Sequence, residues 1–284
     1  MRIYIGLDIG GTKFMVGAGD ENGNLLHSII YETPRNLEQG IELLKKMTRE
    51  VAGNDKIVGM GAAVGGPLDW KKGIVSPLHQ PEWKNVPLKE IMEKEFDCPF
   101  FVDVDTNVAA WAEYKLAQPR PEKLLYMTIS TGIGGGFIAD GKIYRGKNGA
   151  HPEIGHQSIP FRCSHPERVQ CECGVSDCLE ALVSGNGIRR IYGKSPENLT
   201  DNEWEEVAYN LGQGLRNLAA IYLPDVIVLG GGIATGAQEK YFHQAKKVMA
   251  EHLKMTPAPD VRISKLGYDT ALMGAIYIAQ DGLK

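Results

Sequence analysis

Three glycine-rich turns, each directly after a short run of β-branched and other apolar residues, constrain the fold of this chain more than any other feature. A single turn of this kind needs no more than the freedom of glycine to adopt a positive φ. Three of them favour nests of backbone N–H groups that point together and bind phosphate. In chain order the turns are Asp8-Ile9-Gly10-Gly11-Thr12-Lys13, Ser130-Thr131-Gly132-Ile133-Gly134-Gly135-Gly136 and Gly230-Gly231-Gly232.

The first two turns belong to a pattern that occurs twice. A strand, a glycine-rich turn, a second strand, a tight turn and a third strand are predicted between Ile3 and Ile30, and again between Leu124 and Tyr144. Strands and amphipathic helices alternate elsewhere, which predicts an α/β chain. The predicted helices cover residues 37–51, 203–222, 238–253 and 271–279. The prolines of Gln118-Pro119-Arg120-Pro121 mark the best boundary between two halves.

Composition excludes several classes of protein. Hydrophobic residues make up 43% and charged residues 23% of the 284, which is typical of a soluble globular chain. A net charge of −4 argues against a nucleic-acid partner bound through a large basic face. No apolar stretch reaches the ~18 residues of a membrane helix, and Gly6 interrupts any signal peptide. We therefore expect a cytoplasmic protein with neither nucleic-acid nor membrane partners.

The first turn carries side chains suited to a phosphate site. Asp8 is expected to hold a magnesium ion, through water, that bridges phosphate oxygens, and Thr12 offers a hydroxyl. The spacing is not that of a P-loop, which is excluded. A dinucleotide-binding fold is not expected either, because the glycines do not open a long helix after the first strand.

Asp105 lies where a predicted strand, which starts at Phe100, becomes a helix. One interpretation is the N-cap of that helix, a position that aspartate favours. The other is a general base at the carboxyl end of a strand, where ligands of α/β proteins bind. Asp103, two positions earlier, is the main rival for the role of base.

A zinc site is predicted from one histidine and three closely spaced cysteines. Cys171, Cys173 and Cys178 supply three thiolates, and His156 supplies an imidazole, which fills a tetrahedral site and makes it structural. Free buried thiols are the alternative, and Cys163 and His165 are spare ligands. The same metal would fix two carboxylates that can accept hydrogen bonds from a polyol; solvated surface carboxylates are the alternative interpretation of both. They are Glu153 and Glu180.

These motifs occur in the order found in the ROK family (repressors, open reading frames, kinases), which the chain resembles from Ile3 to about Ile278. The motifs are Asp8-Ile9-Gly10-Gly11-Thr12-Lys13, Gly65-Gly66-Pro67, Asp105-x-Asn107, Thr131-Gly132-Ile133-Gly134-Gly135-Gly136, Glu153-x-Gly155-His156 and Cys171-x-Cys173-Gly174-x3-Cys178-x-Glu180.

The resemblance implies a two-lobe, actin-like (ribonuclease-H-like) ATPase fold with a duplicated βββαβα core and a zinc-stapled loop. The N-terminal lobe would be 1–117, with a closing helix at 270–284, and the nucleotide-binding lobe 118–269. The lobes would clamp around ATP and a sugar. The implied enzyme transfers the γ-phosphoryl of MgATP to a hexose, with O6 of glucose as the leading acceptor. A fructokinase, mannokinase or N-acetylhexosamine kinase is the alternative within the family.

The resemblance also implies a role for each motif residue, and a possible homodimer. Asp105 would be the base, and zinc would bind His156, Cys171, Cys173 and Cys178. The sugar would contact Gly66, Asp105, Glu153, His156 and Glu180. The nucleotide would contact Asp8, Gly10, Gly11, Thr12, Lys13, Thr131, Gly132, Gly134, Gly231 and Gly232.

Three positions depart from the pattern of the family's glucokinases. Val104 stands where many of them have a sugar-binding Asn, residues 76–83 replace a usual Pro-Asn-Leu, and His151-Pro152-Glu153 is closer to fructokinase-like members. The family's repressors carry a helix-turn-helix before the first motif. That motif begins here at Asp8, so a repressor is not expected. An inactive zinc-containing sugar sensor is the remaining rival, although a sensor needs no base at Asp105.

Overall fold

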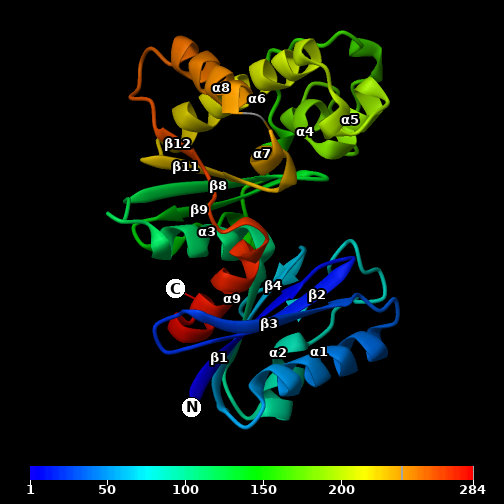
Figure 1. Ribbon diagram of the computed structural model, residues 1–284, viewed down its shortest axis with the longest axis vertical. Coiled ribbons are helices and arrows are strands. Elements are labelled where there is room, and N and C mark those ends of the chain that lie inside the picture. The colour runs from blue at the N-terminus through cyan, green and yellow to red at the C-terminus, as the bar shows by residue number, and fades with distance from the viewer. Residues whose placement is uncertain (238, 284) are drawn as a thin grey trace. The chain divides into compact units, whose positions relative to one another are not determined.

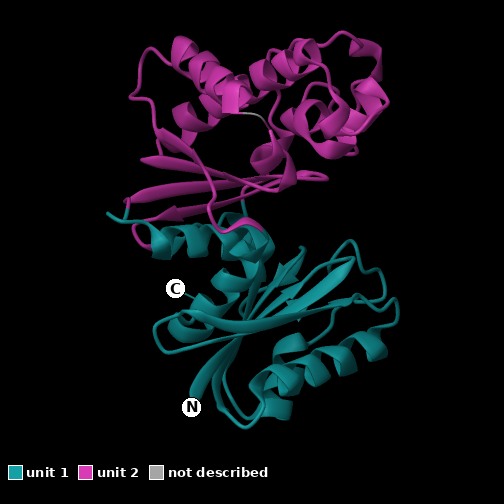
Figure 2. Ribbon diagram, in the orientation of Figure 1, with its two compact units in different colours: residues 1–120, 142–151, 268–284 teal, residues 121–141, 152–267 magenta. Residues whose placement is uncertain are grey.

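The computed structural model describes residues 1–237 and 239–283, which form two compact units (Figures 1 and 2). Unit 1 consists of Met1–Arg120, Lys142–His151 and Tyr268–Lys284, and unit 2 of Pro121–Gly141 and Pro152–Gly267. The expected division, into 1–117 and 118–269, differs from the observed one in the short segment 142–151, which belongs to unit 1. The break after Arg120 lies within the proline-rich segment.

Unit 1 is built on a mixed five-stranded sheet with the order β3-β2-β1-β4-β7. The strands are β1 (Arg2–Ile9), β2 (Lys13–Gly19), β3 (Leu25–Glu32), β4 (Lys56–Val64) and β7 (Phe100–Val104). β1, β4 and β7 run parallel, and their register places Ile9 opposite Val64 and Val64 opposite Val104. These three strands therefore end at the same edge of the sheet.

Four helices and a small hairpin complete unit 1. They are α1 (Leu37–Ala52), α2 (Leu88–Phe96), α3 (Asp105–Leu116), α9 (Thr270–Asp281) and the hairpin of β5 (Leu68–Asp69) and β6 (Ile74–Val75). The predicted periodicity of α1 is confirmed, since Ile41, Leu44, Met47 and Val51 are all buried. The α1 N-terminus is capped by the side chain of Asn36, which accepts from the N–H of Gln39 at 3.2 Å.

Glycines bring α9 into backbone contact with β1 and β4. A Cβ on Gly6 would lie 2.8 Å from the carbonyl oxygen of Leu272, and one on Gly61 would lie 2.1 Å from that of Ala275. No larger residue fits at either position without moving the helix. Two segments from opposite ends of the chain, β1 and α9, thus pack against each other (Figure 1).

Unit 2 repeats the strand order of unit 1. Its sheet has the order β10-β9-β8-β11-β12, which is again third, second, first, fourth and fifth. The strands are β8 (Lys123–Ile129), β9 (Ile133–Ala139), β10 (Lys142–Ile143), β11 (Val226–Gly230) and β12 (Asp260–Ile263). β8, β11 and β12 run parallel, so the predicted repeat is a repeat of topology.

The prediction that the second glycine run is a turn as far as Gly136 is wrong. The turn ends at Gly132, and the following glycines lie within β9, where Gly134 pairs with Thr128. A Cβ on Gly135 would lie 2.3 Å from the Cδ1 atom of Ile154. This glycine therefore allows the segment Ile154–His156 to pack closely on the strand.

Helices of very different lengths complete unit 2. They are α4 (Leu179–Val183), α5 (Gly185–Tyr192), α6 (Asp201–Tyr222), α7 (Gly232–Gly236) and α8 (Glu239–His252). The predicted start of α8 at Gln238 lies outside the described residues. Single 3-10 turns occur along the chain at Lys147–Gly149, Ile154–His156, Pro166–Arg168, Pro196–Asn198 and Gly267–Asp269.

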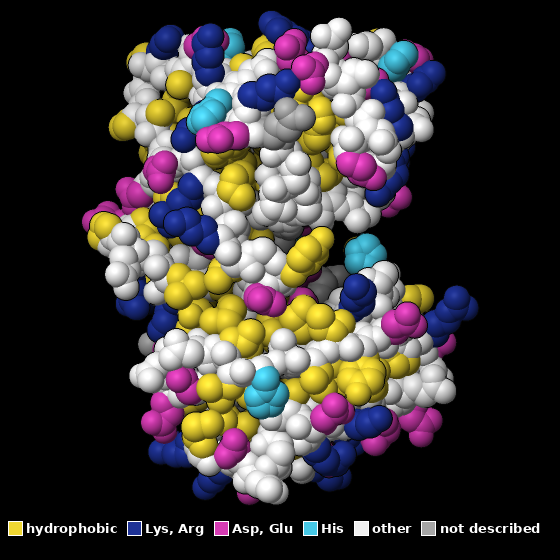
Figure 3. Space-filling view, in the orientation of Figure 1, with side chains coloured by type: hydrophobic (Ala, Val, Ile, Leu, Met, Phe, Trp, Pro, Cys, Tyr) yellow, Lys and Arg dark blue, Asp and Glu magenta, His cyan; other side chains and the backbone are white. Residues whose placement is uncertain are grey.

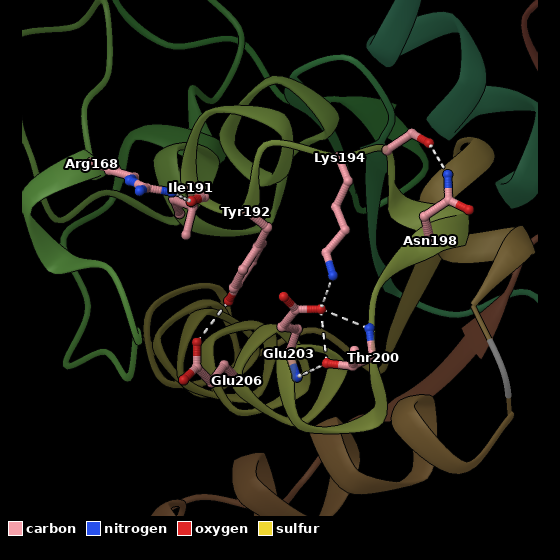
Figure 4. A network of polar contacts seen from close by, with 9 residues as sticks. Arg168, Ile191, Tyr192, Lys194, Asn198, Thr200, Glu203 and Glu206 are labelled. Carbon is pink, nitrogen blue, oxygen red and sulfur yellow. Dashed lines mark hydrogen bonds and ion pairs between the residues drawn. The ribbon is translucent and has the colours of Figure 1, made fainter.

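A polar network joins α5 to the start of α6 (Figure 4). Thr200 and Glu203 form a capping box at the α6 N-terminus. Lys194 lies 2.8 Å from the Glu203 carboxylate, and the Tyr192 hydroxyl donates to Glu206 at 2.8 Å. Burial and the adjacent Glu206 raise the pKa of Tyr192 well above its ordinary value, which keeps this donor protonated.

Charges of both signs are interspersed on the face shown in Figure 3, in keeping with 31 basic and 35 acidic residues. In the described part of the chain, no helix combines the length and the apolar character needed to cross a bilayer.

Candidate active site and metal centre

Three of the motifs of unit 1 meet at one edge of its sheet. The turn Gly10–Thr12 follows β1, Gly65-Gly66 follows β4, and Asp105 follows β7. Because these strands are parallel and in register, their carboxyl ends lie side by side. Ligands of α/β proteins bind at such an edge. Residues that are far apart in the sequence are thereby placed in one candidate site.

Two carboxylates share this edge. Asp105 is exposed at the first position of α3, where its Oδ1 atom accepts from the N–H of Thr106 at 2.7 Å. Burial, and the negative charge of Asp105, raise the pKa of Asp8 to about 7. A divalent cation would offset this repulsion, and carboxylate oxygen is the ligand type that magnesium prefers. The interpretation of Asp105 as an N-cap is wrong, because Val104 occupies that position.

Asp103, the other candidate for the base, is buried and fully engaged in an ion pair and hydrogen bonds. It is 1% exposed, and its Oδ2 atom lies 2.5 Å from an Nη atom of Arg145. Its Oδ1 atom accepts from the N–H of Val104 at 2.7 Å and from the amide of Asn107 at 3.2 Å. A carboxylate with these partners is not available to a substrate hydroxyl. Asp105 is therefore the candidate base.

The first turn is held by two side chains that the sequence did not indicate. Gly10 donates its N–H to the carbonyl of Lys13 at 3.0 Å. Its own carbonyl accepts from the hydroxyl of Thr33 at 2.7 Å and from the amide of Gln80 at 3.0 Å. The side chains of Thr12 and Lys13 are exposed, as expected of ligand contacts. No pattern in the sequence links Thr33 or Gln80 to a backbone carbonyl so far along the chain.

Gly66 lies beside two of the positions that depart from the family pattern. A Cβ on Gly66 would lie 3.7 Å from the Cε1 atom of His151 and 3.9 Å from a methyl group of Val104. Val104 is 7% exposed and offers no side-chain hydrogen bond. The departures therefore change the lining of this part of the site.

The remaining glycine turns lie on neighbouring strands of unit 2. Ser130–Gly132 follows β8, and Gly231-Gly232 follows β11, which is parallel to β8. Gly231 has a φ of +86°, and a Cβ there would lie 2.4 Å from the carbonyl oxygen of Ile129. The N–H groups of Gly185 and Asn186 brace the turn by donating to the carbonyls of Ser130 and Thr131 at 2.7 and 3.0 Å. Gly134 is not in this turn but in β9.

The four predicted zinc ligands come together in unit 2. One ligand atom from each of His156, Cys171, Cys173 and Cys178 lies within 4.8 Å of the others. The Sγ atoms of Cys173 and Cys178 are 3.9 Å apart, and Cys171 Sγ lies 3.7 Å from His156 Nδ1. A tetrahedral zinc with bonds of about 2.3 Å to sulfur separates its ligand atoms by roughly 3.6–3.8 Å. The donor set and its spacing therefore fit zinc.

The spare ligands lie outside this cluster. Cys163 and His165 are not members of it. Instead, Cys163 Sγ accepts from the N–H of His165 at 3.4 Å, and the His165 ring packs edge-on against Tyr192. The cysteines of the cluster are free thiols, and burial raises the pKa of Cys178 to about 12. Zinc would displace this proton on binding.

Glu180 connects the cluster to the second glycine turn. Its Oε2 atom accepts from the N–H of Ile133 at 2.7 Å, and its Oε1 atom lies 3.7 Å from Cys171 Sγ. It is half-buried and is not a solvated surface carboxylate. Glu153 is exposed, and its carbonyl accepts from the N–H of His156 at 3.1 Å, which fixes its place next to the cluster.

Comparison with known proteins gives matches along almost the whole chain. The model of the ROK family matches residues 4–282. A fructokinase of Streptococcus mutans is 30% identical over 277 residues, with 92% of this chain and 90% of that protein covered. The structure of a ROK hexokinase from Thermus thermophilus is similar with a TM-score of 0.86 at 32% identity, covering 98% and 97%. A ROK family glucokinase from Streptomyces griseus, solved in complex with glucose and AMPPNP, gives 0.80 at 27% identity, covering 99% and 100%.

Proposed function

The chain belongs to the ROK family, and on this premise we propose that it is an ATP-dependent sugar kinase. The reaction transfers the γ-phosphoryl of MgATP to a hexose hydroxyl, with O6 of glucose as the leading acceptor. The observation that carries the proposal is that exposed Asp105 and the Gly10–Thr12 turn lie at the same edge of the sheet, while Asp103 is paired with Arg145. The Streptomyces griseus relative, which binds glucose and an ATP analogue, supports both substrates.

Asp105 acts as the general base in this proposal. The acceptor hydroxyl donates a hydrogen bond to its carboxylate. As the hydroxyl oxygen bonds to the γ-phosphorus, its proton passes to Asp105, and the bond to the β–γ bridging oxygen breaks with its electron pair leaving on ADP. Phosphoryl transfer needs little covalent help beyond alignment and charge neutralisation. One exposed carboxylate at the end of a strand is sufficient for the proton.

The glycine turns and their side chains bind the nucleotide. Backbone N–H groups and hydroxyls of the first and second turns take the phosphate oxygens, while Gly231 and Gly232 lie by the adenosine. Magnesium, when bound, neutralises phosphate charge, and Asp8 would hold it through water. The phosphate contacts are Gly10, Gly11, Thr12, Lys13, Thr131 and Gly132.

In this proposal the sugar contacts Gly66, Asp105, Glu153, His156 and Glu180. Carboxylates and an imidazole can pair with vicinal hydroxyls. Val104 cannot replace the asparagine of many family glucokinases, so one sugar hydroxyl lacks that partner here. A fructokinase, mannokinase or N-acetylhexosamine kinase is the alternative for this reason, and the fructokinase relative supports it.

A structural zinc would bind His156, Cys171, Cys173 and Cys178. All four coordination positions would be filled by protein, so the metal supplies rigidity and no chemistry. His156 Nδ1 faces the cluster, which leaves Nε2 for a hydrogen bond to the sugar. The metal would hold Glu180 in place through its neighbour Cys171.

The test is sugar-dependent release of ADP from MgATP. Glucose is expected to give saturating turnover far above background hydrolysis, in a series with fructose, mannose, N-acetylglucosamine and N-acetylmannosamine. If a different sugar is the best substrate, the kinase assignment stands and that sugar replaces glucose as the acceptor. If a sugar raises the melting temperature without turnover, the protein is a sugar sensor and the kinase assignment is wrong.

A further inference from the structure

Unit 1 contains a cavity that lies outside the residues assigned above to sugar and nucleotide. Its volume is about 500 Å³, and it is lined by Leu68–Lys71 at the β5–β6 hairpin and by Arg145, Gly146, Asn148 and Gly149 of a loop. Both segments belong to unit 1. Sites for small molecules have volumes of about 300–1,000 Å³. The cavity is therefore large enough for an organic ligand.

Trp70 forms a fixed aromatic wall. The Arg145 guanidinium lies 3.8 Å from the centroid of its ring. A Cβ on Gly149 would lie 3.0 Å from the indole Nε1, so the loop passes very close to the ring. The cation–π contact and the close backbone hold the indole in one orientation. A rigid ring with a polar N–H can contact both the apolar face and the hydroxyls of a ligand.

Both segments of the wall are held by their own hydrogen bonds. In the loop, Gly146 donates to the carbonyl of Ala150 at 2.8 Å, and Gly149 donates to that of Gly146 at 3.1 Å. In the hairpin, Asp69 accepts from the N–H groups of Lys71 and Lys72, each at 3.1 Å. A cavity with preformed walls binds at a lower entropic cost.

The charges in the walls are balanced. The only arginine of the lining, Arg145, is committed to buried Asp103, and the lining residues Asp69 and Lys71 carry opposite charges. An anion would need an uncommitted guanidinium or ammonium cluster. Indole, amide and carboxylate groups suit the donors and acceptors of hydroxyl groups. This combination matches a neutral polyhydroxy ring.

Both segments of the cavity wall are close in the chain to residues at the place where the proposed function puts the sugar. Leu68 is two residues after Gly66, and Gly149 is two residues before His151. His151 Cε1 lies 3.7 Å from the position of a Cβ on Gly66. We propose that the cavity is a subsite for a neutral glycosyl unit, an assignment that rests on the proposed function. The unit is either the second ring of a glycoside substrate or a separate free sugar.

The test compares disaccharides with monosaccharides in the wild type and in Trp70→Ala. KM would be measured for maltose, cellobiose and sucrose, and for glucose and fructose, with MgATP. The ratio of disaccharide KM to monosaccharide KM is expected to rise at least tenfold in Trp70→Ala. Lys147→Ala is the matched control, since Lys147 is exposed in the same loop and does not line the cavity. Its ratio is expected to stay at the wild-type value.

Measuring saccharide binding without ATP tests the subsite independently of kinase activity. Saturation-transfer NMR would follow the same sugars, and calorimetry would count glucose molecules per chain. A second glucose that is lost in Trp70→Ala supports the free-sugar source. Trp70-dependent saccharide binding without any turnover supports the subsite and overturns the kinase.

Three outcomes overturn the subsite. They are equal effects of Trp70→Ala on both classes of sugar, the absence of any Trp70-dependent saccharide binding, and Trp70-dependent binding of inorganic phosphate instead. If Trp70→Ala does not fold, Asn148→Gly replaces it. That change removes a lining amide at a residue whose φ is +58°, a conformation that glycine adopts readily.

Discussion

The carboxylate of Asp103 lies 2.5 Å from the guanidinium of Arg145, in a pair whose side chains are only 1% and 13% exposed. This ion pair distinguishes the roles of two aspartates that are both candidate bases from the sequence alone. Asp103 is a structural residue at the end of β7, and Asp105 is the exposed one. It also ties the segment 142–151 to the strand that carries the candidate base.

We expect Asp105→Asn to abolish turnover while sugar binding remains. Loss of a general base lowers kcat by about 10²–10⁴-fold, whereas the amide keeps the size of the side chain. Sugar-dependent ADP release gives kcat, and calorimetry gives the dissociation constant of the sugar, which should change by less than about threefold. Turnover in the mutant equal to that of the wild type would remove Asp105 from the role of base.

We expect Asp103→Asn to destabilise the fold instead. Removing one charge of a buried ion pair leaves Arg145 uncompensated, which costs about 3–5 kcal/mol. Urea unfolding would measure the loss in the free energy of unfolding. Asp105→Asn is the matched control, because Asp105 is exposed, and its free energy should change by no more than about 1 kcal/mol. Comparable stability of both variants would contradict the structural role of Asp103.

We expect Gln80→Leu to weaken nucleotide binding specifically. The change removes the 3.0 Å hydrogen bond to the Gly10 carbonyl but keeps the side-chain volume. A net loss of about 1 kcal/mol corresponds to roughly a fivefold higher KM for MgATP. Thr33→Val, which removes the other donor to this carbonyl, should act in the same direction. A rise in the KM of the sugar with no change for MgATP would show that this turn does not hold the nucleotide.

We expect one zinc ion per chain after extensive dialysis, because four ligand atoms lie within 4.8 Å of one another. Elemental analysis would measure it. Cys171→Ser should lose the metal and lower both the melting temperature and sugar affinity, since Glu180 lies beside Cys171. Cys163→Ser is the control and should retain the metal. Zinc-free wild type, or equal zinc contents in both variants, would exclude the site.

We expect Gly231→Ala to impair folding and nucleotide binding, whereas Gly236→Ala is tolerated. Gly231 has a φ of +86° and a ψ of 158°, a conformation that costs alanine about 1–3 kcal/mol, and its Cβ would clash with a backbone carbonyl at 2.4 Å. A Cβ on Gly236, at the other end of α7, meets no atom within 4 Å. Thermal unfolding and the KM for MgATP would be compared. Equal behaviour of the two variants would show that the close approach at Gly231 is unimportant.

Much of the fold follows from local sequence. Short apolar runs and glycines predict the strands and turns, and the spacing of Ile41, Leu44 and Met47 predicts α1, because these signals act within a few residues. The family resemblance is confirmed by the match over residues 4–282. The cluster of His156, Cys171, Cys173 and Cys178 is also predictable, since these residue types at this spacing indicate a metal site.

Other features depend on partners far along the chain. Asp103 and Asp105 differ because Arg145 folds back onto one of them. From the sequence alone, the glycines after Gly132 cannot be told apart from glycines of a turn. They belong to a strand on which Ile154 packs closely at Gly135, and that contact comes from a distant part of the chain. Gln80 contacts a carbonyl 70 positions earlier, and a backbone acceptor leaves no trace in side-chain patterns.

The contact of α9 with β1 and β4 sets an order of events during synthesis. Unit 1 begins with β1, yet its core includes Leu272, Ala275 and Ile276, which the ribosome adds only after all of unit 2. Unit 2 is complete at Gly267 and can fold while the first strands still lack their covering helix. Translation at about 5–20 residues per second leaves the glycine-lined face of those strands uncovered for many seconds. Unit 1, which starts first, is therefore the last of the two units to complete its core.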